Sequence, residues 1–255
     1  MKSEHKIWGY VFILFLILVW EILSGANIIE KLFLPPPSKI AVSFYKLLLS
    51  SDFWIDLTSS LYRMFFGYAI AVMLAVTLGI LMGSFKLLYN LLDPLIEFLR
   101  PLPSVAIIPA AILFLGIGDV MKVFIIVWAS TWPILLNTID GIRNVDPVQI
   151  DTGRVFGMNK LEITRSIKIP NAAPNIATGM RISLAIALIL TITSEMVSGT
   201  NGIGLFILNS QRSFRIPEMY AGIITVAAIG FLLNLIFVKL ERKLLKWNKE
   251  ATRQT

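Results

Sequence analysis

Residues 144–174 read NVDPVQIDTGRVFGMNKLEITRSIKIPNAAP and form a long polar connection between two apolar segments. Asp146 followed by Pro147 is typical of a helix start. The aspartate side chain accepts hydrogen bonds from free backbone N–H groups, and proline needs no donor in the first turn. Gly157 can end this helix in the left-handed conformation that glycine adopts at little cost. The stretch therefore predicts a short helix that ends at a glycine.

A second short helix is predicted directly after the glycine. Asn159, with Glu162 three residues later, has the spacing of a capping box. Pro170 and Pro174 are expected to terminate this helix. A rigid pair of helices with a glycine elbow suits docking into a groove on a soluble partner, and it also suits a bare surface hairpin. The residues by themselves leave both interpretations open.

The composition of the whole chain indicates a membrane protein. Its 255 residues are 56% apolar and only 15% charged, with a net charge of +7 and a mean hydropathy of +0.76. Soluble domains carry about 25% charged residues. The chain has no Cys and a single His, at position 5, which excludes disulfides, thiolate metal sites and histidine triads. We predict no catalytic, cofactor-binding or metal-ligating residues.

Six apolar segments are each about long enough to cross a bilayer, for which a helix needs about 20 mostly apolar residues. They are residues 7–24, 64–83, 101–118, 123–139, 175–197 and 219–238. The first carries Glu21, and the fifth carries Arg181 and Glu195. The prediction is an all-α, polytopic membrane protein of about six transmembrane helices. A short interfacial helix is expected in the outer loop, after Leu34-Pro35-Pro36-Pro37.

The distribution of Lys and Arg predicts the orientation, because positive charge is retained on the cytoplasmic side. With six spans, 16 of these residues fall on the side of the two termini and 7 on the other. Both termini are therefore predicted to be cytoplasmic. Most of the basic residues are explained by a role in setting the membrane orientation, next to anionic lipids. We therefore predict no nucleic-acid partner.

Small residues recur every four positions in the second span, at Gly67, Ala71, Ala75, Gly79 and Gly83. One face of this helix is thus bare, and a neighbouring backbone can approach it closely. The pattern does not distinguish packing within one subunit from packing across a dimer.

The fifth span has a similar stripe with polar members, Gly179, Ser183, Ala187, Thr191 and Glu195. Hydroxyl groups often only join helices, whereas an ionisable group inside a span is a pathway candidate. We predict that Ser183, Thr191 and Glu195 border a translocation pathway. A cavity wall is also expected in the fourth span, at Ser130, Thr131, Pro133 and Asn137.

The polar connection resembles a known motif. Asp151-Thr152-Gly153, Gly157 and Ile169-Pro170 have the spacing of the EAA coupling motif of binding-protein-dependent ABC importer permeases with the type I fold. Thr152 and Gly153 replace the usual two alanines. The resemblance assigns ATPase coupling to Asp151, Gly157, Ile169 and Pro170.

Further stretches resemble the branch of this family that imports aliphatic sulfonates, taurine and nitrate. They are Leu34–Pro37, Leu99–Pro103, Phe114–Gly118, Gly141–Asp146 and Asn201–Gly204.

The resemblance implies a half-channel in the bacterial inner membrane. It would pair with a second permease copy, in a homodimer, receive a small solute from an extracytoplasmic solute-binding protein and be driven by two ATP-binding cassette subunits. The chain lacks a G-x-x-x-x-G-K-S/T phosphate loop, so ATP hydrolysis is expected on the partner. We divide the chain into an N-terminal helix and outer loop (1–60), a permease core (61–240) with coupling helices at 146–170, and a basic cytoplasmic tail (241–255).

Three other functions compete with this interpretation. A secondary transporter needs a coupling group near mid-membrane, and the acidic residues in the predicted spans, Glu21 and Glu195, lie near their outer ends. An intramembrane enzyme needs clustered carboxylates, which the predicted spans lack. A non-transporting membrane scaffold is separated from an importer only by co-purification with an ATPase.

Overall fold

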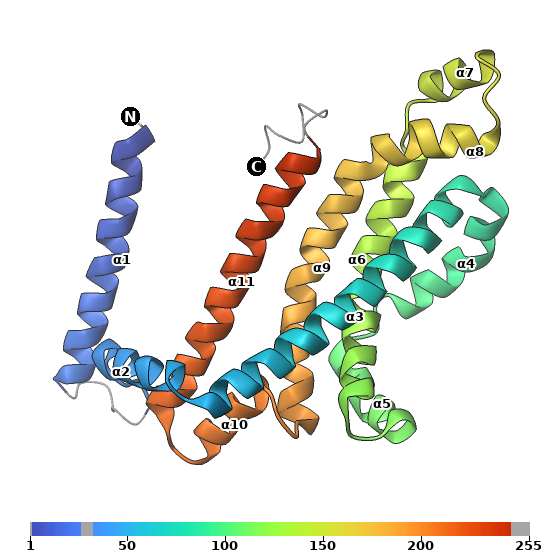
Figure 1. Cartoon of the computed structure of the whole chain (residues 1–255). Helices are drawn as coiled ribbons and strands as arrows, with labels where there is room; N and C mark the ends of the chain where they lie inside the picture. Colours follow the sequence, from blue (N-terminus) through green and yellow to red (C-terminus); the bar gives the residue numbers. More distant parts are fainter. Residues whose placement is uncertain (1, 27–32, 246–255) are drawn as a thin grey trace.

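The computed structural model describes residues 2–26 and 33–245. Every regular element in this part of the chain is a helix (Figure 1), so the predicted all-α fold is confirmed. The elements are α1 (Lys2–Gly25), α2 (Pro37–Leu48), α3 (Ser51–Ser84), α4 (Lys86–Leu99), η1 (Ser104–Ile107), α5 (Ile108–Leu115), α6 (Asp119–Arg143), α7 (Pro147–Val155), α8 (Lys160–Ile163), the π-turn η2 (Thr164–Lys168), α9 (Ile169–Ser198), α10 (Ile203–Arg212) and α11 (Ile216–Leu244). The predicted tail, 241–255, lies outside the described residues from 246 onward.

Helices α3, α6 and α9 form the centre of the molecule, with α6 packed against both of the others (Figure 1). Helix α11 lies beside α9, and α1 stands apart from the body and makes its main contact with α2. α1 begins and α11 ends at the end of the molecule that carries α7 and α8, which we call the elbow end. α2, α5 and α10 lie at the opposite, far end.

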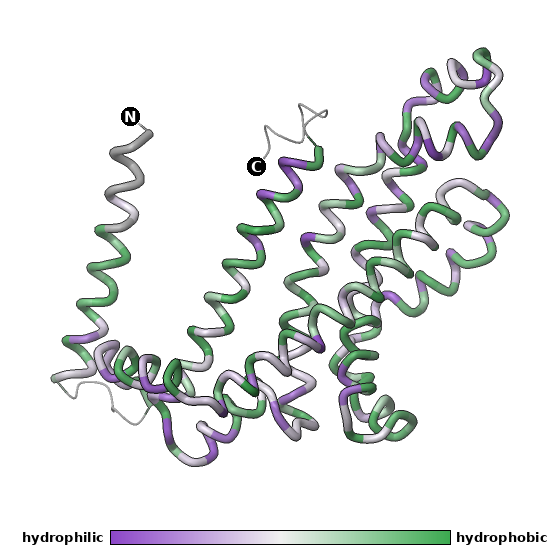
Figure 2. The backbone as a smooth tube through the Cα atoms, in the orientation of Figure 1, coloured by the Kyte–Doolittle hydropathy of each residue, from purple (hydrophilic) through white to green (hydrophobic). Residues whose placement is uncertain are grey.

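Four of the six predicted spans coincide with helices that are long and apolar enough to cross a membrane. These helices are α3, α6, α9 with the preceding α8 and η2, and α11. Figure 2 shows the apolar residues concentrated along their lengths. α1 adds a shorter apolar stretch, Val11–Gly25.

The third predicted span, residues 101–118, is not a straight transmembrane helix. Its residues form η1 and the eight-residue α5, and eight residues rise only about 12 Å. Together with α4, these helices make one broken apolar unit that is bent by 87°. Pro101 and Pro103 lie at the break, where proline removes backbone donors and disfavours helix at the preceding residue.

Helix α3 begins at Ser51, well before the predicted start at Met64. The sequence between them carries Asp52, Asp56 and Arg63, which made it look like part of the outer loop. Arg63 is nevertheless buried, because its charge is paired inside the protein. A helix is present where the interfacial one was predicted, as α2. Glu21 accepts hydrogen bonds from the N and Oγ atoms of Ser38, at 3.0 and 2.7 Å, and so joins α1 to the start of α2.

The small residues of α3 face α6 of the same subunit, which decides between the two packing alternatives. A Cβ built on Gly79 would lie 2.6 Å from the Cβ of Thr138, and one on Gly83 would lie 2.7 Å from the Cβ of Ile142. Gly67 approaches Ile126 in the same way. Only glycine allows the two backbones to come this close.

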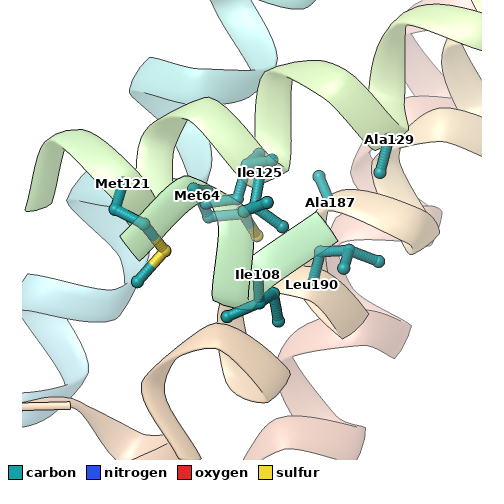
Figure 3. Packing of buried hydrophobic residues seen from close by; sticks show 9 residues of the cluster. Met64, Ile108, Met121, Ile125, Ala129, Ala187 and Leu190 are labelled. Carbon is teal, nitrogen blue, oxygen red and sulfur yellow. The ribbon is translucent and has the colours of Figure 1, made fainter. Parts of the chain in front are cut away.

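Apolar side chains from four elements meet at the centre, as Figure 3 shows. Met64 of α3, Ile108 of α5, Ile125 of α6 and Leu190 of α9 belong to one buried cluster. This cluster attaches the short α5 to the three central helices.

The second elbow helix does not end at Pro170 or Pro174, as predicted. Helical structure continues from α8 through η2 into α9, with Pro170 in the first turn of α9 and Pro174 inside it. The widened π-turn ends at Lys168, two residues before Pro170. Such turns accommodate a local change in the backbone hydrogen-bond ladder, so that proline need not end a helix.

Candidate functional site

The first half of the elbow folds as the local sequence predicts. Asp146 accepts a hydrogen bond from the backbone N of Val148 at 2.8 Å, and Pro147 opens α7. After α7, Gly157 has φ +78°, with no other atom near its missing Cβ. The glycine elbow is therefore confirmed.

The capping box at the second half is also confirmed. Asn159 Oδ1 accepts from the backbone N of Leu161 and of Glu162, both at 3.0 Å, and Glu162 Oε2 accepts from Asn159 N at 2.7 Å. These reciprocal bonds satisfy donors that an exposed helix start would otherwise leave open. The direction in which α8 leaves Gly157 is thus fixed locally.

The tip of the elbow presents apolar side chains to solvent. Val155 is 86% and Phe156 80% exposed, beside the ion pair of Arg154 with Asp151 at 2.8 Å. Inside the elbow, Gly153 is buried, and a Cβ there would lie 2.7 Å from Cδ1 of Ile167. That these side chains bind a partner stays a prediction.

A second polar feature lies near the far end of the central helices, and its core is the ion pair between Arg63 and Glu195. The Nη1 atom of Arg63 lies 2.8 Å from Oε1 of Glu195, and both side chains are almost fully buried. Ser60 of α3 donates to the same carboxylate at 2.8 Å. This pair therefore connects α3 to α9.

The loop between α9 and α10 is bound to the same pair. The backbone N of Gly204 donates to Oε2 of Glu195 at 3.0 Å, and that of Gly202 donates to Asp56 at 2.7 Å. Arg63 also donates to the backbone O and side-chain oxygen of Asn201. A Cβ on Gly202 would collide with the Glu195 carboxylate, so glycine is required there.

Asp119, in the first turn of α6, completes this group. Its Oδ1 lies 2.7 Å from Nε of Arg63 and 3.8 Å from Nζ of Lys122. We call Ser60, Arg63, Asp119, Lys122 and Glu195 the polar cluster.

The three residues predicted to border a pathway are buried in helix packing. Ser183 donates to the backbone O of Ser130 on α6, and Thr191 donates to the backbone O of Ala187 on its own helix. Glu195 lies in the polar cluster. Their role in translocation stays a prediction.

A cavity lies elsewhere, between α4, α6 and α9. Its volume is about 660 Å³. Pro133 and Asn137 line it, as predicted for the fourth span, whereas Ser130 and Thr131 do not. The full lining is Tyr89, Asp93, Ile96, Glu97, Arg100, Ser104, Ala129, Trp132, Pro133, Leu136, Asn137, Asp140 and Ile186. Three carboxylates and one guanidinium give this lining a formal charge of −2.

Comparison with known sequences decides the family. The family described as "Binding-protein-dependent transport system inner membrane component" matches residues 75–246. The chain belongs to this family. It is accordingly a multi-pass inner-membrane permease subunit of an ABC importer, a transport component rather than an enzyme, and systems of this kind include an ATPase and a solute-binding protein.

Named relatives of the permease extend over most of its length. A Bacillus subtilis (strain 168) protein named as an aliphatic sulfonates transport permease is 33% identical, over 91% of this chain and 84% of the relative. The taurine transport permease of Escherichia coli (strain K12) is 29% identical, over 92% and 88%. The nitrate import permease of Synechocystis sp. (strain ATCC 27184 / PCC 6803 / Kazusa) is 32% identical, over 89% and 84%.

The permease also shares its fold with solved transporters. A methionine ABC transporter in an inward-facing conformation superposes with a TM-score of 0.65 at 15% identity, covering 76% of this chain and 98% of that one.

Sequence reasoning missed several polar residues of the permease. Arg63 and Asp119 were placed in loops, and the acidic cavity residues were not singled out. In α4, Tyr89, Asp93 and Glu97 recur every four residues in a mostly apolar helix. This spacing is the signal that could have located the cavity wall.

Proposed function

We propose that two copies of this permease form the membrane channel of an importer for a small aliphatic sulfonate, taurine or nitrate-like solute. An extracytoplasmic solute-binding protein delivers the solute, and two ATP-binding cassette subunits bind the elbows of the dimer. The observation that carries this proposal is the elbow, a locally rigid unit with exposed apolar side chains at its tip.

Coupling to the ATPase is proposed for Asp151, Gly157, Ile169 and Pro170, which have the spacing of the EAA motif. Asp151 is paired with Arg154 on the exposed side of α7. Ile169 and Pro170 form the first turn of α9, so the motif extends from the docking surface to a central helix. When ATP binding moves the partner ATPase and with it the elbow, the movement would thus be passed directly to the membrane helix α9.

The elbow end is proposed to face the cytoplasm, with both chain termini on that side. Support comes from the basic residues of this end, among them Arg154, Lys160 and Arg165 in the elbow and Arg242 and Lys243 in the last turn of α11. Positive charge near span ends is retained inside the cell. The proposed domain division keeps a core of 61–240 with coupling helices at 146–170.

A homodimer is proposed because α1 lies apart from the body of its own subunit. Phe12, Leu14 and Phe15 of α1 are each more than half exposed. In a membrane these apolar faces contact either lipid or a second permease, and a half-channel requires the latter to complete its pathway.

For the pathway, we propose that the solute passes the cavity between α4 and α6. Ser183, Thr191 and Glu195 then hold α9 in place behind its wall. The formal charge of −2 in the lining favours a solute with an ammonium group over a simple inorganic anion. Among the candidate solutes, a taurine-like aminosulfonate fits this cavity best.

The substrate proposal is tested with uptake in vesicles that contain the whole importer. We expect faster uptake of taurine than of methanesulfonate, which lacks the ammonium group. Glu97→Gln combined with Asp140→Asn should reduce this preference by about tenfold, which corresponds to about 1.4 kcal/mol of charge interaction. Asp52→Asn, a charge change at the exposed first turn of α3, should leave the preference unchanged. Equal uptake of both solutes by the parent would contradict the aminosulfonate proposal.

The coupling proposal is tested with Gly157→Val. A β-branched residue at φ +78° costs about 1–2 kcal/mol, and the chain relieves this strain by changing the direction of α8. We expect normal membrane insertion, with at least a tenfold loss of ATPase binding in a pull-down and a parallel loss of ATP-driven uptake.

Gly116→Val is the matched control for Gly157→Val. Gly116 also has a positive φ, +74°, and no atom near its missing Cβ, but it lies between α5 and α6 at the far end. A valine at Gly116 is therefore also strained, but at the opposite end of the molecule. If both variants bind the ATPase like the parent, the elbow is not the coupling element.

A further inference from the structure

Two buried cations in the polar cluster meet at one exposed carboxylate. The side chains of Arg63 and Lys122 are 3% and 0% exposed, whereas that of Asp119 is 58% exposed. Asp119 Oδ1 lies 2.7 Å from Arg63 Nε and 3.8 Å from Lys122 Nζ. The carboxylate therefore separates the two cations from solvent.

Lys122 is the unusual member of this group. Within residues 2–26 and 33–245, its Nζ atom has no hydrogen-bond partner although it is buried. Burying an ammonium group without hydrogen bonds is costly, so such groups are normally paired or bound to a ligand. At 3.8 Å, Asp119 balances the charge of Lys122 but does not supply the missing hydrogen bond.

The remaining partners in the polar cluster cannot balance both cations. Glu195 pairs with Arg63 and also accepts from Ser60 and the backbone N of Gly204. Without Asp119, one carboxylate would face two cations, and the cluster would carry a net charge of +1. A site of this kind attracts a singly charged anion.

The side chain of Asp119 is placed so that it can rotate away from Arg63 and return. More than half of its side chain is already in contact with solvent, so rotation away from Arg63 requires no opening of the core. The first turn of α6, where the partial positive charge of the helix dipole lies, also favours a replacement anion.

We propose that Arg63 and Lys122 form an anion site that Asp119 occupies in the absence of solute, and that the sulfonate or similar oxyanion of an arriving solute displaces Asp119. This inference rests on the proposed function, because it assumes a solute with an anionic group. The site lies where α6 begins, at the far end (Figure 1), which is the end proposed to receive solute. The oxyanion supplies Lys122 with its missing acceptor.

The test measures binding of methanesulfonate to the purified importer by isothermal titration calorimetry. Asp119→Asn keeps an oxygen acceptor for Arg63 and removes the competing charge, so the apparent Kd should fall at least tenfold. Adding Lys122→Met, which has similar length and no charge, should abolish this gain. Asp52→Asn removes one exposed carboxylate at the same end and should bind like the parent.

An unchanged Kd in folded Asp119→Asn would overturn the site, as would a gain that survives Lys122→Met. Should Asp119→Asn fail to assemble, Asp119→Ser serves the same purpose, and Lys122→Met alone must weaken methanesulfonate binding by the parent. ATP-driven uptake by the parent importer is measured in parallel. If the parent takes up sulfonate but the variants do not change the Kd for methanesulfonate, the anion site alone is refuted. If the parent transports no sulfonate, the proposed function is refuted.

Discussion

Glu195→Gln should lower the free energy of unfolding of the permease by about 3–5 kcal/mol, which is the usual cost of removing one partner from a buried ion pair. The substitution leaves Arg63 with Asp119 as its only carboxylate. It also places an amide N–H₂ where the carboxylate accepts from Ser60 and Gly204, so that donor faces donor. The measurement is denaturation of the purified chain in detergent, followed by tryptophan fluorescence.

A double-mutant cycle separates the ion pair from the rest of the polar cluster. Glu195→Met and Arg63→Met should each destabilise the protein strongly, and the double variant should be more stable than the sum of the two losses predicts, because no buried charge of the pair remains. Asp52→Asn, at an exposed carboxylate, should change stability by less than about 1 kcal/mol. Additive losses would show that the two side chains do not interact as the structure indicates.

Gly79→Val should destabilise the protein by about 1–3 kcal/mol, since extra atoms in a well-packed interface force the surrounding structure to shift. The first added carbon would already lie 2.6 Å from the Cβ of Thr138 and 3.2 Å from the backbone O of Leu135, and a backbone cannot yield as a side-chain end can. The same denaturation assay provides the measurement.

Ala69→Val provides the control for this substitution. Ala69 is on α3 but exposed, so the same bulk is added away from α6. Its stability should remain close to that of the parent. Comparable losses at both positions would mean that β-branching within α3, and not contact with α6, causes the effect.

Local signals in the sequence predicted the structure well where the interacting groups are close in the chain. The cap at Asp146, the capping box at Asn159 and the positive φ of Gly157 all involve partners within three residues, so they could be recognised without knowledge of the fold. The stripe from Gly67 to Gly83 predicted a close helix contact, but its partner, α6, became known only from the structure.

Predictions were wrong where the environment of a residue depends on partners that are distant in the sequence. Arg63 looked like a loop residue because a charge in a span is costly, but its partner Glu195 is 132 positions away. The acidic residues of the cavity, on α4 and α6, likewise meet only in three dimensions. The bend of 87° between α4 and the η1–α5 segment also could not be predicted, because prolines indicate a break but not its angle.

Helix α9 directly joins the two features on which the proposals depend. It begins at Ile169, beside the elbow, and ends at Ser198, just after Glu195. Its 30 residues extend about 45 Å, and the ion pair to Arg63 anchors it at the far end. A push on the elbow would therefore tilt α9 about this anchor, and a tilt of about 10° would move its start at Ile169 by roughly 7 Å. The molecule thus needs little rotation at one end to produce a wide displacement at the other.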